Sequence, residues 1–521
     1  MALVYRLSLV DVILTTHAQV SQQSASSISI IGQQDFHSAG IAYLDPVYFE
    51  KYKNMTSELA ETVADHLSTP SVDNETIVAN VTAMLDFEQN LYKAFKGSSP
   101  FKKNSLKLCQ IKEKWPSFNW DLYLSTLEGN DVYHGLPADF TYSVDDEGLE
   151  LTLKVLQQTD TEIIQNYIVW RFVHHYLAYM DPKLRSHLLE EYGDLFRAIT
   201  VESLCAQTLD KSITFATGRA FSDAYVPHDA ERVLRTMMAN IIDSYRTVMG
   251  SVSWLNKESR ERILRKIDSI VYTFGYPPWI QTDLSLNSYY ESIEVTAGEP
   301  YFHIYNQFAA FAAKLKFDSF IKPWTREDFI DASIDTVNAA YDPTRNGLSI
   351  LSGILRDPLF RIDFPFLHNF AALGGAMSHE IGHAFDPRGI YYDWEGKFGE
   401  SVLTSDVSKV FDKTVTECLQ KEYATFCFPL KDEEGNPICL ENAKYAVPDN
   451  TADNLAVKLS HIAFKTFLRR HGTEAPIPGL GNYSLDQQFF SATLRVTALL
   501  THKQGRDLQL HFCIHPDHFE S

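Results

Sequence analysis

Apolar residues recur every three to four positions through most of the chain between residues 45 and 320. This spacing puts them on one face of an α-helix, so it predicts helices that each bury one side in a shared core. With 521 residues, 45% of them hydrophobic, the chain is long enough to form two or more domains. The expected helices span about 48–67, 76–95, 161–180, 182–196 and 300–317, with a further pair inside 230–271 that is interrupted near 250–256.

The pattern changes after residue 322. Residues 336–341 alternate between apolar and polar side chains, which is typical of a strand, and residues 349–355 have the composition of a second strand. We therefore expect a mostly helical domain over residues 1–325 and a smaller mixed domain over residues 326–521. The predicted fold class is mainly α, with a small mixed α+β part.

The mixed domain contains the sequence Met-Ser-His-Glu-Ile-Gly-His-Ala-Phe-Asp, an H-E-x-x-H pattern with His379, Glu380 and His383. If residues 371–386 form a helix, the two histidines lie one turn apart on the same face. Their imidazoles can then share one Zn²⁺, and the carboxylate between them can act on a metal-bound water. Apolar neighbours would bury these polar groups, which would then need partners, and a metal supplies one. The motif therefore predicts a zinc hydrolase.

A catalytic zinc ion needs three protein ligands and one open position. Asp449 and Asp453 lie four residues apart at the start of a helix that stays apolar as far as residue 464. One of them can face the metal while the other accepts a hydrogen bond from a ligand histidine. Asp386, three residues after His383, is another candidate for the second role. Alternatively, Asp449 or Asn450 only caps the helix, and the capping and metal-site roles can coexist.

Several segments together resemble the neprilysin and endothelin-converting-enzyme family of zinc metallopeptidases, a family of the gluzincin type. The resemblance runs from about residue 40 to 490 and is most specific at 337–341, 353–355, 378–386 and 449–454. It implies a zincin-like domain with an edge strand beside the zinc helix, and such an edge can hold an extended peptide by main-chain hydrogen bonds. The implied function is a zinc-dependent metalloendopeptidase that uses one Zn²⁺ and cleaves peptide substrates.

The resemblance also implies a role for each matching residue. His379 and His383 are zinc ligands, and Glu380 is the general base that takes a proton from the attacking water. Asn338 and Ala339 hydrogen-bond the backbone of the substrate. The proton then passes to the leaving amine.

The third ligand is where the chain departs from the family. Asp453 matches the family residue that orients a ligand histidine, often described as a proton donor, and Asp449 stands where the family has a glutamate ligand. A side chain one methylene shorter loses ~1.5 Å of reach, so we expect a weaker zinc site. The family also carries a histidine and an arginine near its C-terminus, whereas here His515 is the only echo and no arginine follows Arg506.

We therefore expect the N-terminal anchor and the C-terminal end of the family to be lacking from this chain, which becomes truncated or diverged after about residue 490. These departures favour an alternative function: a catalytically impaired, neprilysin-like pseudopeptidase that binds peptides or partners without cutting them.

The charge and several short motifs limit the partners and the cellular location that the chain can have. Its 46 basic and 67 acidic residues give a formal net charge of −21, which argues against nucleic acid or an anionic membrane as a partner. No apolar run reaches the ~18 residues that span a bilayer, and Arg6 and Asp11 make a strand region the preferred interpretation of the N-terminus over a signal peptide. Sequons that favour a glycosylated, extracellular or cell-surface chain occur at Asn54, Asn74, Asn80 and Asn482. Cys427 and Cys439 flank a turn-rich segment and form either a local disulfide or two buried thiols.

Overall fold

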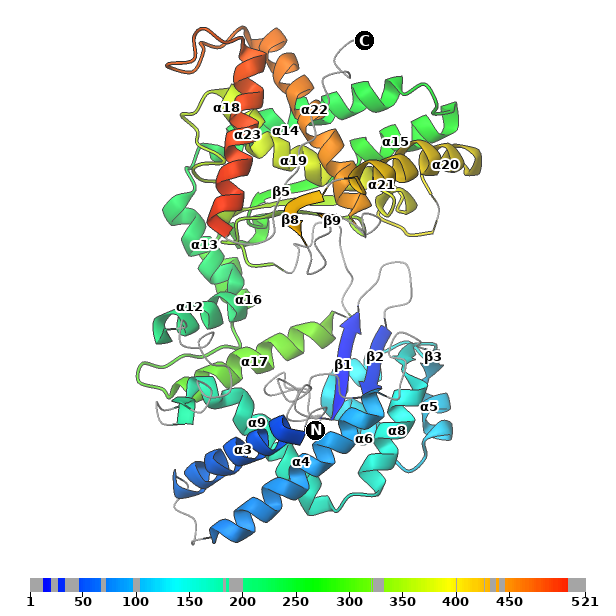
Figure 1. Ribbon diagram of the computed structural model, residues 1–521, viewed down its shortest axis with the longest axis vertical. Helices are drawn as coiled ribbons and strands as arrows, with labels where there is room; N and C mark the ends of the chain where they lie inside the picture. The colour runs from blue at the N-terminus through cyan, green and yellow to red at the C-terminus, as the bar shows by residue number, and fades with distance from the viewer. Residues whose placement is uncertain are drawn as a thin grey trace. The chain divides into compact units, whose positions relative to one another are not determined.

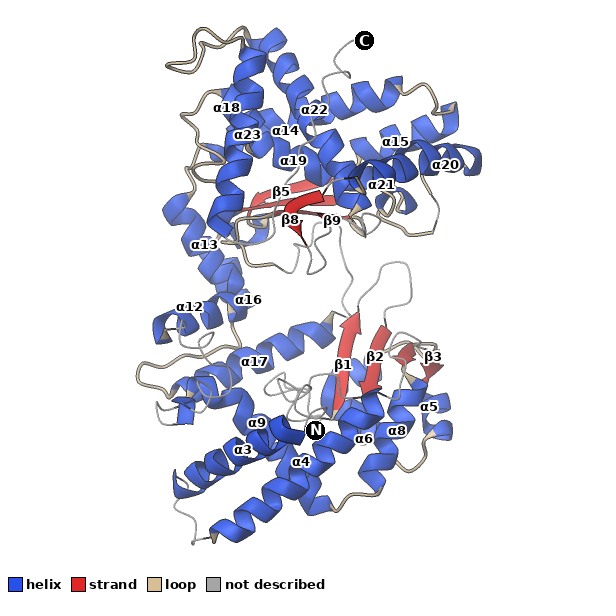
Figure 2. Ribbon diagram, in the orientation of Figure 1, coloured by secondary structure: helices blue, strands red, loops and turns tan. Residues whose placement is uncertain are grey.

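The computed structural model shows a mainly helical chain with small sheets, as the sequence predicts (Figures 1 and 2). It describes residues 13–19, 27–32, 46–66, 72–96, 104–180, 184–186, 200–319, 321, 332–399, 401–425, 427–431, 437–439 and 446–504. Most of the predicted helix at 182–196, most of the N-terminal segment, and His515 lie outside these ranges.

The chain divides into two compact units. Unit 1 consists of Met1–Ser212 and Tyr290–Trp324, and unit 2 consists of Ile213–Tyr289 and Thr325–Ser521. This division differs from the single boundary expected near residue 325, because residues 213–289 pack with the unit that carries the H-E-x-x-H helix. Periodicity shows that such a segment is helical, but it does not show which core the segment joins.

Unit 1 packs helices around α4 and beside a four-stranded sheet. α4 (Asn74–Lys96) contacts α3 (Pro46–His66), α8 (Asp146–Gln157) and α9 (Thr161–Tyr176). The strand order is β1, β2, β4, β3, with bounds Leu14–Gln19, Ser27–Gly32, Thr141–Val144 and Asn104–Lys107. Further helices described in this unit are α5 (Leu108–Lys114), α6 (Trp120–Glu128), α7 (Asn130–Gly135), α12 (Val201–Ser212) and α17 (Tyr301–Asp318).

Unit 2 contains a three-stranded sheet in the order β5 (Val271–Gly275), β7 (Gly347–Leu351), β6 (Ala339–Asp342). β6 pairs antiparallel with β7 and forms one edge of this sheet. The first strand thus begins at Ala339, later than the 336 expected from the sequence. The helices described here are α13 (Thr214–Tyr225), α14 (Ala230–Ser251), α15 (Lys257–Asp268), α16 (Asp283–Tyr289), α18 (Phe366–Ala371), α19 (Leu373–Gly382), α20 (Ser405–Phe411), α21 (Glu417–Tyr423), α22 (Val447–His471) and α23 (Leu485–Gln504).

A hairpin of β8 (Cys427–Lys431) and β9 (Pro437–Cys439) completes the strands described in unit 2. Its backbone register places Cys427 opposite Cys439. The side chains of these two cysteines lie outside the described part of the chain, so the choice between a disulfide and two thiols stays open.

The helix that carries the H-E-x-x-H motif is shorter than the range 371–386 expected from the sequence. α19 begins after a break at Ala372 and is followed by a 3-10 turn at His383–Phe385. The chain becomes extended at Asp386, since Pro387 disfavours helical geometry in the residue before it. His383 still has helical φ and ψ angles of −61° and −21°, so it remains about one turn beyond His379.

α19 lies against α22, α14 and the β6 and β7 strands (Figure 1). The approach to α22 is close: a Cβ atom on Gly382 would lie 2.8 Å from the Cα atom of Ala452. The backbone of α22 therefore passes so close to the end of the motif helix that only glycine fits at residue 382. This packing brings the first turns of α22, with Asp449 and Asp453, next to the two histidines.

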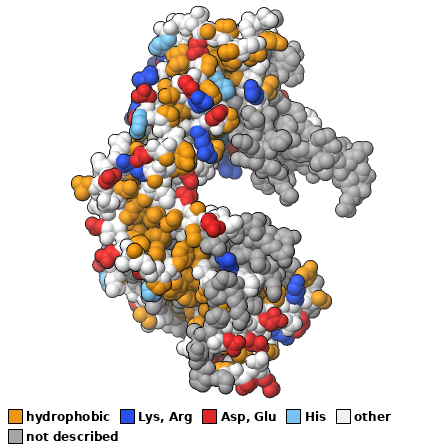
Figure 3. Space-filling model, turned by 90° about the vertical axis from the view of Figure 1, so that its left-hand side faces the viewer, with side chains coloured by type: hydrophobic (Ala, Val, Ile, Leu, Met, Phe, Trp, Pro, Cys, Tyr) orange, Lys and Arg blue, Asp and Glu red, His pale blue; other side chains and the backbone are white. Residues whose placement is uncertain are grey.

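None of the helices in the described ranges combines the length and the hydropathy that a bilayer crossing requires. On the face shown in Figure 3, acidic side chains lie among basic ones.

Candidate active site

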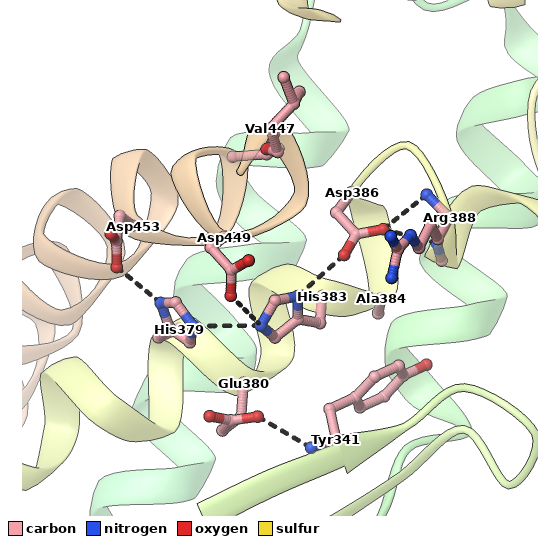
Figure 4. A network of polar contacts seen from close by, with 12 residues as sticks. Tyr341, His379, Glu380, His383, Ala384, Asp386, Arg388, Val447, Asp449 and Asp453 are labelled. Carbon is pink, nitrogen blue, oxygen red and sulfur yellow. Dashed lines mark hydrogen bonds and ion pairs between the residues drawn. The ribbon is translucent and has the colours of Figure 1, made fainter. Parts of the chain in front are cut away.

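The two motif histidines face each other through their Nε2 atoms, which lie 3.1 Å apart (Figure 4). The Nδ1 atom of His379 is 2.7 Å from Asp453 Oδ1, and that of His383 is 2.8 Å from Asp386 Oδ2. Because a carboxylate accepts hydrogen bonds, each Nδ1 is assigned the proton, and each Nε2 keeps its lone pair. Two lone pairs at this distance repel unless a cation lies between them.

The separation of these donor atoms fits a zinc ion. Tetrahedral zinc with bonds of 2.0–2.1 Å to nitrogen would hold two ligand nitrogens about 3.3 Å apart. Asp449 Oδ1 lies 3.9 Å from His383 Nε2, and one ligand atom each from His379, His383 and Asp449 falls within 4.8 Å of the others. The residues could therefore supply three ligands, although the aspartate stands about 0.6 Å farther out than tetrahedral zinc geometry requires.

The two kinds of ligand differ in how firmly they are held. The imidazoles of His379 and His383 are about four-fifths buried, whereas the Asp449 side chain is 66% exposed. Burial is the largest single influence on the pKa of His379 and lowers it, but the hydrogen bond to Asp453 and the negative charges of Asp453, Glu380 and Asp449 together raise the pKa above its ordinary value. The carboxylate behind the imidazole thus makes His379 a more basic ligand.

Glu380 points from α19 toward the β6 strand (Figure 4). Its Oε2 atom accepts a hydrogen bond of 2.8 Å from the backbone N–H of Tyr341. Burial raises the pKa of Glu380, while the neighbouring His379 and His383 oppose that rise. A half-buried carboxylate beside two imidazoles that could bind a metal has the position that a general base requires.

The outer edge of β6 carries the two residues that the sequence singles out for substrate binding. The carbonyl oxygen of Asn338 accepts from Leu351 on the β7 side, so the N–H groups of Ala339 and Tyr341 lie on the other side. The Ala339 N–H donates to Asn338 Oδ1 at 2.9 Å. The Asn338 side chain is exposed, so a bound peptide can displace it from this N–H.

Several residues of the site were not anticipated from the sequence. The hydroxyl of the fully buried Tyr245 on α14 donates to the carbonyl oxygen of Ser378, just before His379. The Tyr341 N–H and the buried Lys266 also contact the motif helix or the turn after it. Tyr245 and Lys266 lie more than a hundred positions from the motif, and no local pattern could have revealed these contacts.

Two family models match the chain. Models described as peptidase family M13 match residues 4–277, with the N-terminal model, and residues 338–518. The second match extends beyond residue 490, where the sequence resemblance was expected to end.

Curated relatives show the same similarity. The chain is 25% identical over 461 residues to neprilysin-11 of Caenorhabditis elegans, which covers 85% of this chain and 52% of the relative. It is 24% identical over 489 residues to endothelin-converting enzyme 1 of Homo sapiens, covering 90% of this chain and 61% of the relative. The chain thus spans about half to three-fifths of the length of these relatives.

Solved structures share the fold. The zinc metalloprotease Zmp1 of Mycobacterium tuberculosis in its open state aligns with a TM-score of 0.74 at 17% identity, over 97% of this chain and 77% of that one. PepO of Lactobacillus rhamnosis aligns with a TM-score of 0.65 at 16% identity, over 94% of this chain and 74% of that one.

Proposed function

Because the chain belongs to peptidase family M13, we propose that it is a zinc-dependent metalloendopeptidase with His379, His383 and Asp449 as the ligands of one zinc ion. The observation that carries this proposal is the pair of Nε2 atoms 3.1 Å apart, each backed by a carboxylate on Nδ1. Burying two imidazole lone pairs that face each other is energetically unfavourable unless a cation lies between them. Bound zinc would supply a Lewis acid that polarises a peptide carbonyl and makes water more acidic.

Substrate binding, proton transfer and orientation of the histidines are performed by separate residues of the chain. The β6 edge, with Asn338 and Ala339, holds the substrate backbone in an extended conformation beside α19. Glu380 takes the proton of the attacking water and delivers it to the leaving amine. Its hydrogen bond to the Tyr341 N–H keeps the carboxylate between the substrate strand and the histidines. Asp453 keeps His379 in the tautomer whose Nε2 lone pair is free.

A second function is favoured by one specific observation, the position of Asp449. Its oxygen stands 3.9 Å from His383 Nε2, and its side chain is 66% exposed. A ligand placed so far out lowers zinc affinity, which would leave a chain that binds peptides along β6 without cleaving them.

Hydrolysis of a quenched fluorescent peptide library by the purified, zinc-loaded chain distinguishes the two functions. We expect cleavage that Glu380→Gln abolishes. Stoichiometric zinc without any cleavage would overturn the enzyme function in favour of peptide binding. Cleavage that persists unchanged in Glu380→Gln would exclude the proposed base.

We also propose an extracellular or cell-surface location. The asparagines of the four sequons, Asn54, Asn74, Asn80 and Asn482, are all exposed, as a glycan requires. Expression in a secretory system followed by removal of N-glycans should shift the apparent mass, and an unchanged mass would count against this location.

A further inference from the structure

Lys266 on α15 is a buried charge outside the set of proposed catalytic residues. Its side chain is 0% exposed. The ammonium group donates three hydrogen bonds, to the carbonyl oxygens of Ala384 at 2.9 Å, Gly389 at 2.6 Å and Tyr392 at 2.8 Å. Each of its three protons thus has an acceptor, and all three acceptors belong to the segment that follows the motif helix.

Burying this lysine is unfavourable by itself. Burial lowers the pKa of Lys266 to about 7, although the negative charges of Asp386 and Asp393 oppose the change. An apolar side chain of similar volume would fill the same space without this penalty. What the ammonium adds is the ability to gather three carbonyl groups. One of them, from Ala384, lies in the 3-10 turn directly after the motif helix, where a cation is also favoured by the helix dipole.

The segment that Lys266 gathers is the one that positions Asp386. Asp386 Oδ1 accepts from the N–H groups of Arg388 and Gly389, both at 2.7 Å, while its Oδ2 faces His383 Nδ1. The turn is also pressed against the helix, since a Cβ atom on Gly389 would lie 1.9 Å from the His383 carbonyl oxygen. Lys266 binds the carbonyl oxygen of the same Gly389 whose N–H group holds Asp386.

A second connection runs from α15 to the substrate side. The buried Asn346 donates through Nδ2 to the Lys266 carbonyl oxygen at 2.9 Å and to the Trp394 carbonyl oxygen at 3.2 Å. Its Oδ1 accepts from the Tyr341 hydroxyl at 2.7 Å. Tyr341 is the residue whose N–H donates to Glu380. The end of α15 is therefore connected by hydrogen bonds both to the turn that holds Asp386 and, through Asn346 and Tyr341, to Glu380.

We propose that Lys266 is a positioning residue for the metal site, which fixes the turn from Ala384 to Tyr392 so that Asp386 keeps the His383 imidazole oriented toward the metal. The metal part of this inference rests on the proposed function. The role of Lys266 in fixing the turn is independent of the proposed function, and it can be measured without any metal.

The test compares Lys266→Met, which keeps length and removes the donors, with Lys266→Gln, which keeps two donors. Ile267→Ala is the matched control, since it removes core packing from the same helix and no hydrogen bond to the turn. Three measurements are made on each protein. Hydrogen exchange of the peptide covering residues 384–392 is followed in the metal-free state, with residues 349–355 as the internal reference. Zinc affinity is measured by competition with a chelator, together with the visible absorption of the cobalt form.

In Lys266→Met we expect exchange in residues 384–392 to quicken by about tenfold or more, with the reference peptide unchanged. Zinc affinity should fall by about 10–100-fold, with an altered cobalt spectrum, because the support of a ligand histidine is loosened. In Lys266→Gln, the exchange rate and the zinc affinity should lie between those of the wild type and Lys266→Met. If Lys266→Met does not fold, the comparison is made with Lys266→Gln alone. Ile267→Ala should lower the melting temperature while leaving the zinc affinity and the cobalt spectrum unchanged.

Unchanged exchange in residues 384–392 of either Lys266 variant would overturn the inference. So would zinc affinities that fall equally in Lys266→Met and Ile267→Ala. A wild-type chain that binds no zinc would contradict the proposed function instead, and the exchange comparison would still decide whether Lys266 holds the turn.

Discussion

Burial raises the pKa of two carboxyl groups, Glu380 in unit 2 and Glu128 in unit 1, but their surroundings differ. Glu380 accepts from the Tyr341 N–H and lies beside His379 and His383, which oppose the effect of burial on its pKa. Glu128 is 3% exposed and accepts one hydrogen bond, 3.1 Å from the Tyr142 hydroxyl. Its Oε2 atom has no partner among the described residues, and burial raises the pKa of Glu128 to about 8.

The difference shows what separates a site from a buried polar residue. Around Glu380, polar groups from α14, α15, β6 and α22 each make a hydrogen bond to the motif helix or to the turn that follows it. Around Glu128, the fold accommodates the carboxyl group by keeping it protonated. Burial alone therefore does not identify the chemistry, whereas a convergent and hydrogen-bonded set of groups does.

Glu380→Gln should have the largest effect. Removing the base without changing shape should lower peptide hydrolysis by about 10²–10⁴-fold. The zinc content and the melting temperature should stay near those of the wild type. Glu128→Gln is the control and should leave hydrolysis unchanged. If both variants lost activity equally, the contrast between the two carboxyl groups would fail.

Asp453→Ala should come next. Without its hydrogen bond, His379 loses its fixed orientation, and zinc affinity should fall by about 10–100-fold in chelator competition. Asp486→Ala is a matched control in the same unit, since Asp486 Oδ1 lies 2.9 Å from His461 Nε2 in a similar carboxylate–histidine contact, and neither residue is among the proposed metal ligands. Equal losses in the two variants would show that Asp453 acts only through the stability of the fold.

Asp449→Glu should change zinc affinity in the opposite direction. The extra methylene adds ~1.5 Å of reach, which covers the shortfall of the aspartate, so affinity should rise about tenfold. Asp449→Asn, which removes the charge, should lower it. An affinity that stays constant across both variants would show that residue 449 is not a ligand.

Glu128→Gln should have the smallest effect, on stability alone. In the unfolded chain the Glu128 carboxyl group loses its proton near the ordinary glutamate pKa of 4.5, while in the folded chain it keeps the proton up to about pH 8. The folded state therefore binds more protons in this window, so the free energy of unfolding falls as pH rises from 4.5 through 8. Glu128→Gln should remove this fall, raising the melting temperature by a few degrees at about pH 8 and leaving it unchanged at about pH 4. The same shift at both pH values would contradict a protonated Glu128.

Much of the fold was predictable from local patterns, because amphipathic spacing determines where helices lie. The helices at 46–66, 74–96, 161–176 and 301–318 match the expected ranges closely. The end of the motif helix was missed by several residues, although Pro387 was a usable signal for it. The assignment of residues 213–289 to unit 2 was not predictable, because it depends on contacts between distant segments.

The site divides in the same way. The H-E-x-x-H spacing and the four-residue step from Asp449 to Asp453 are local, and the structure places these side chains together. Lys266, Tyr245 and the Tyr341 N–H were missed because they support the site through backbone atoms. A hydrogen bond between a backbone group and a residue far away in the sequence produces no regular residue spacing that could be recognised beforehand.

The most direct test is the zinc content of the purified chain and of His379→Ala and His383→Ala, measured by elemental analysis after dialysis against metal-free buffer. We expect about one zinc ion per wild-type chain and none in either variant, because two ligands cannot retain the ion without the third. A wild-type chain without zinc, or zinc retained in both variants, would contradict a metal site built on these histidines.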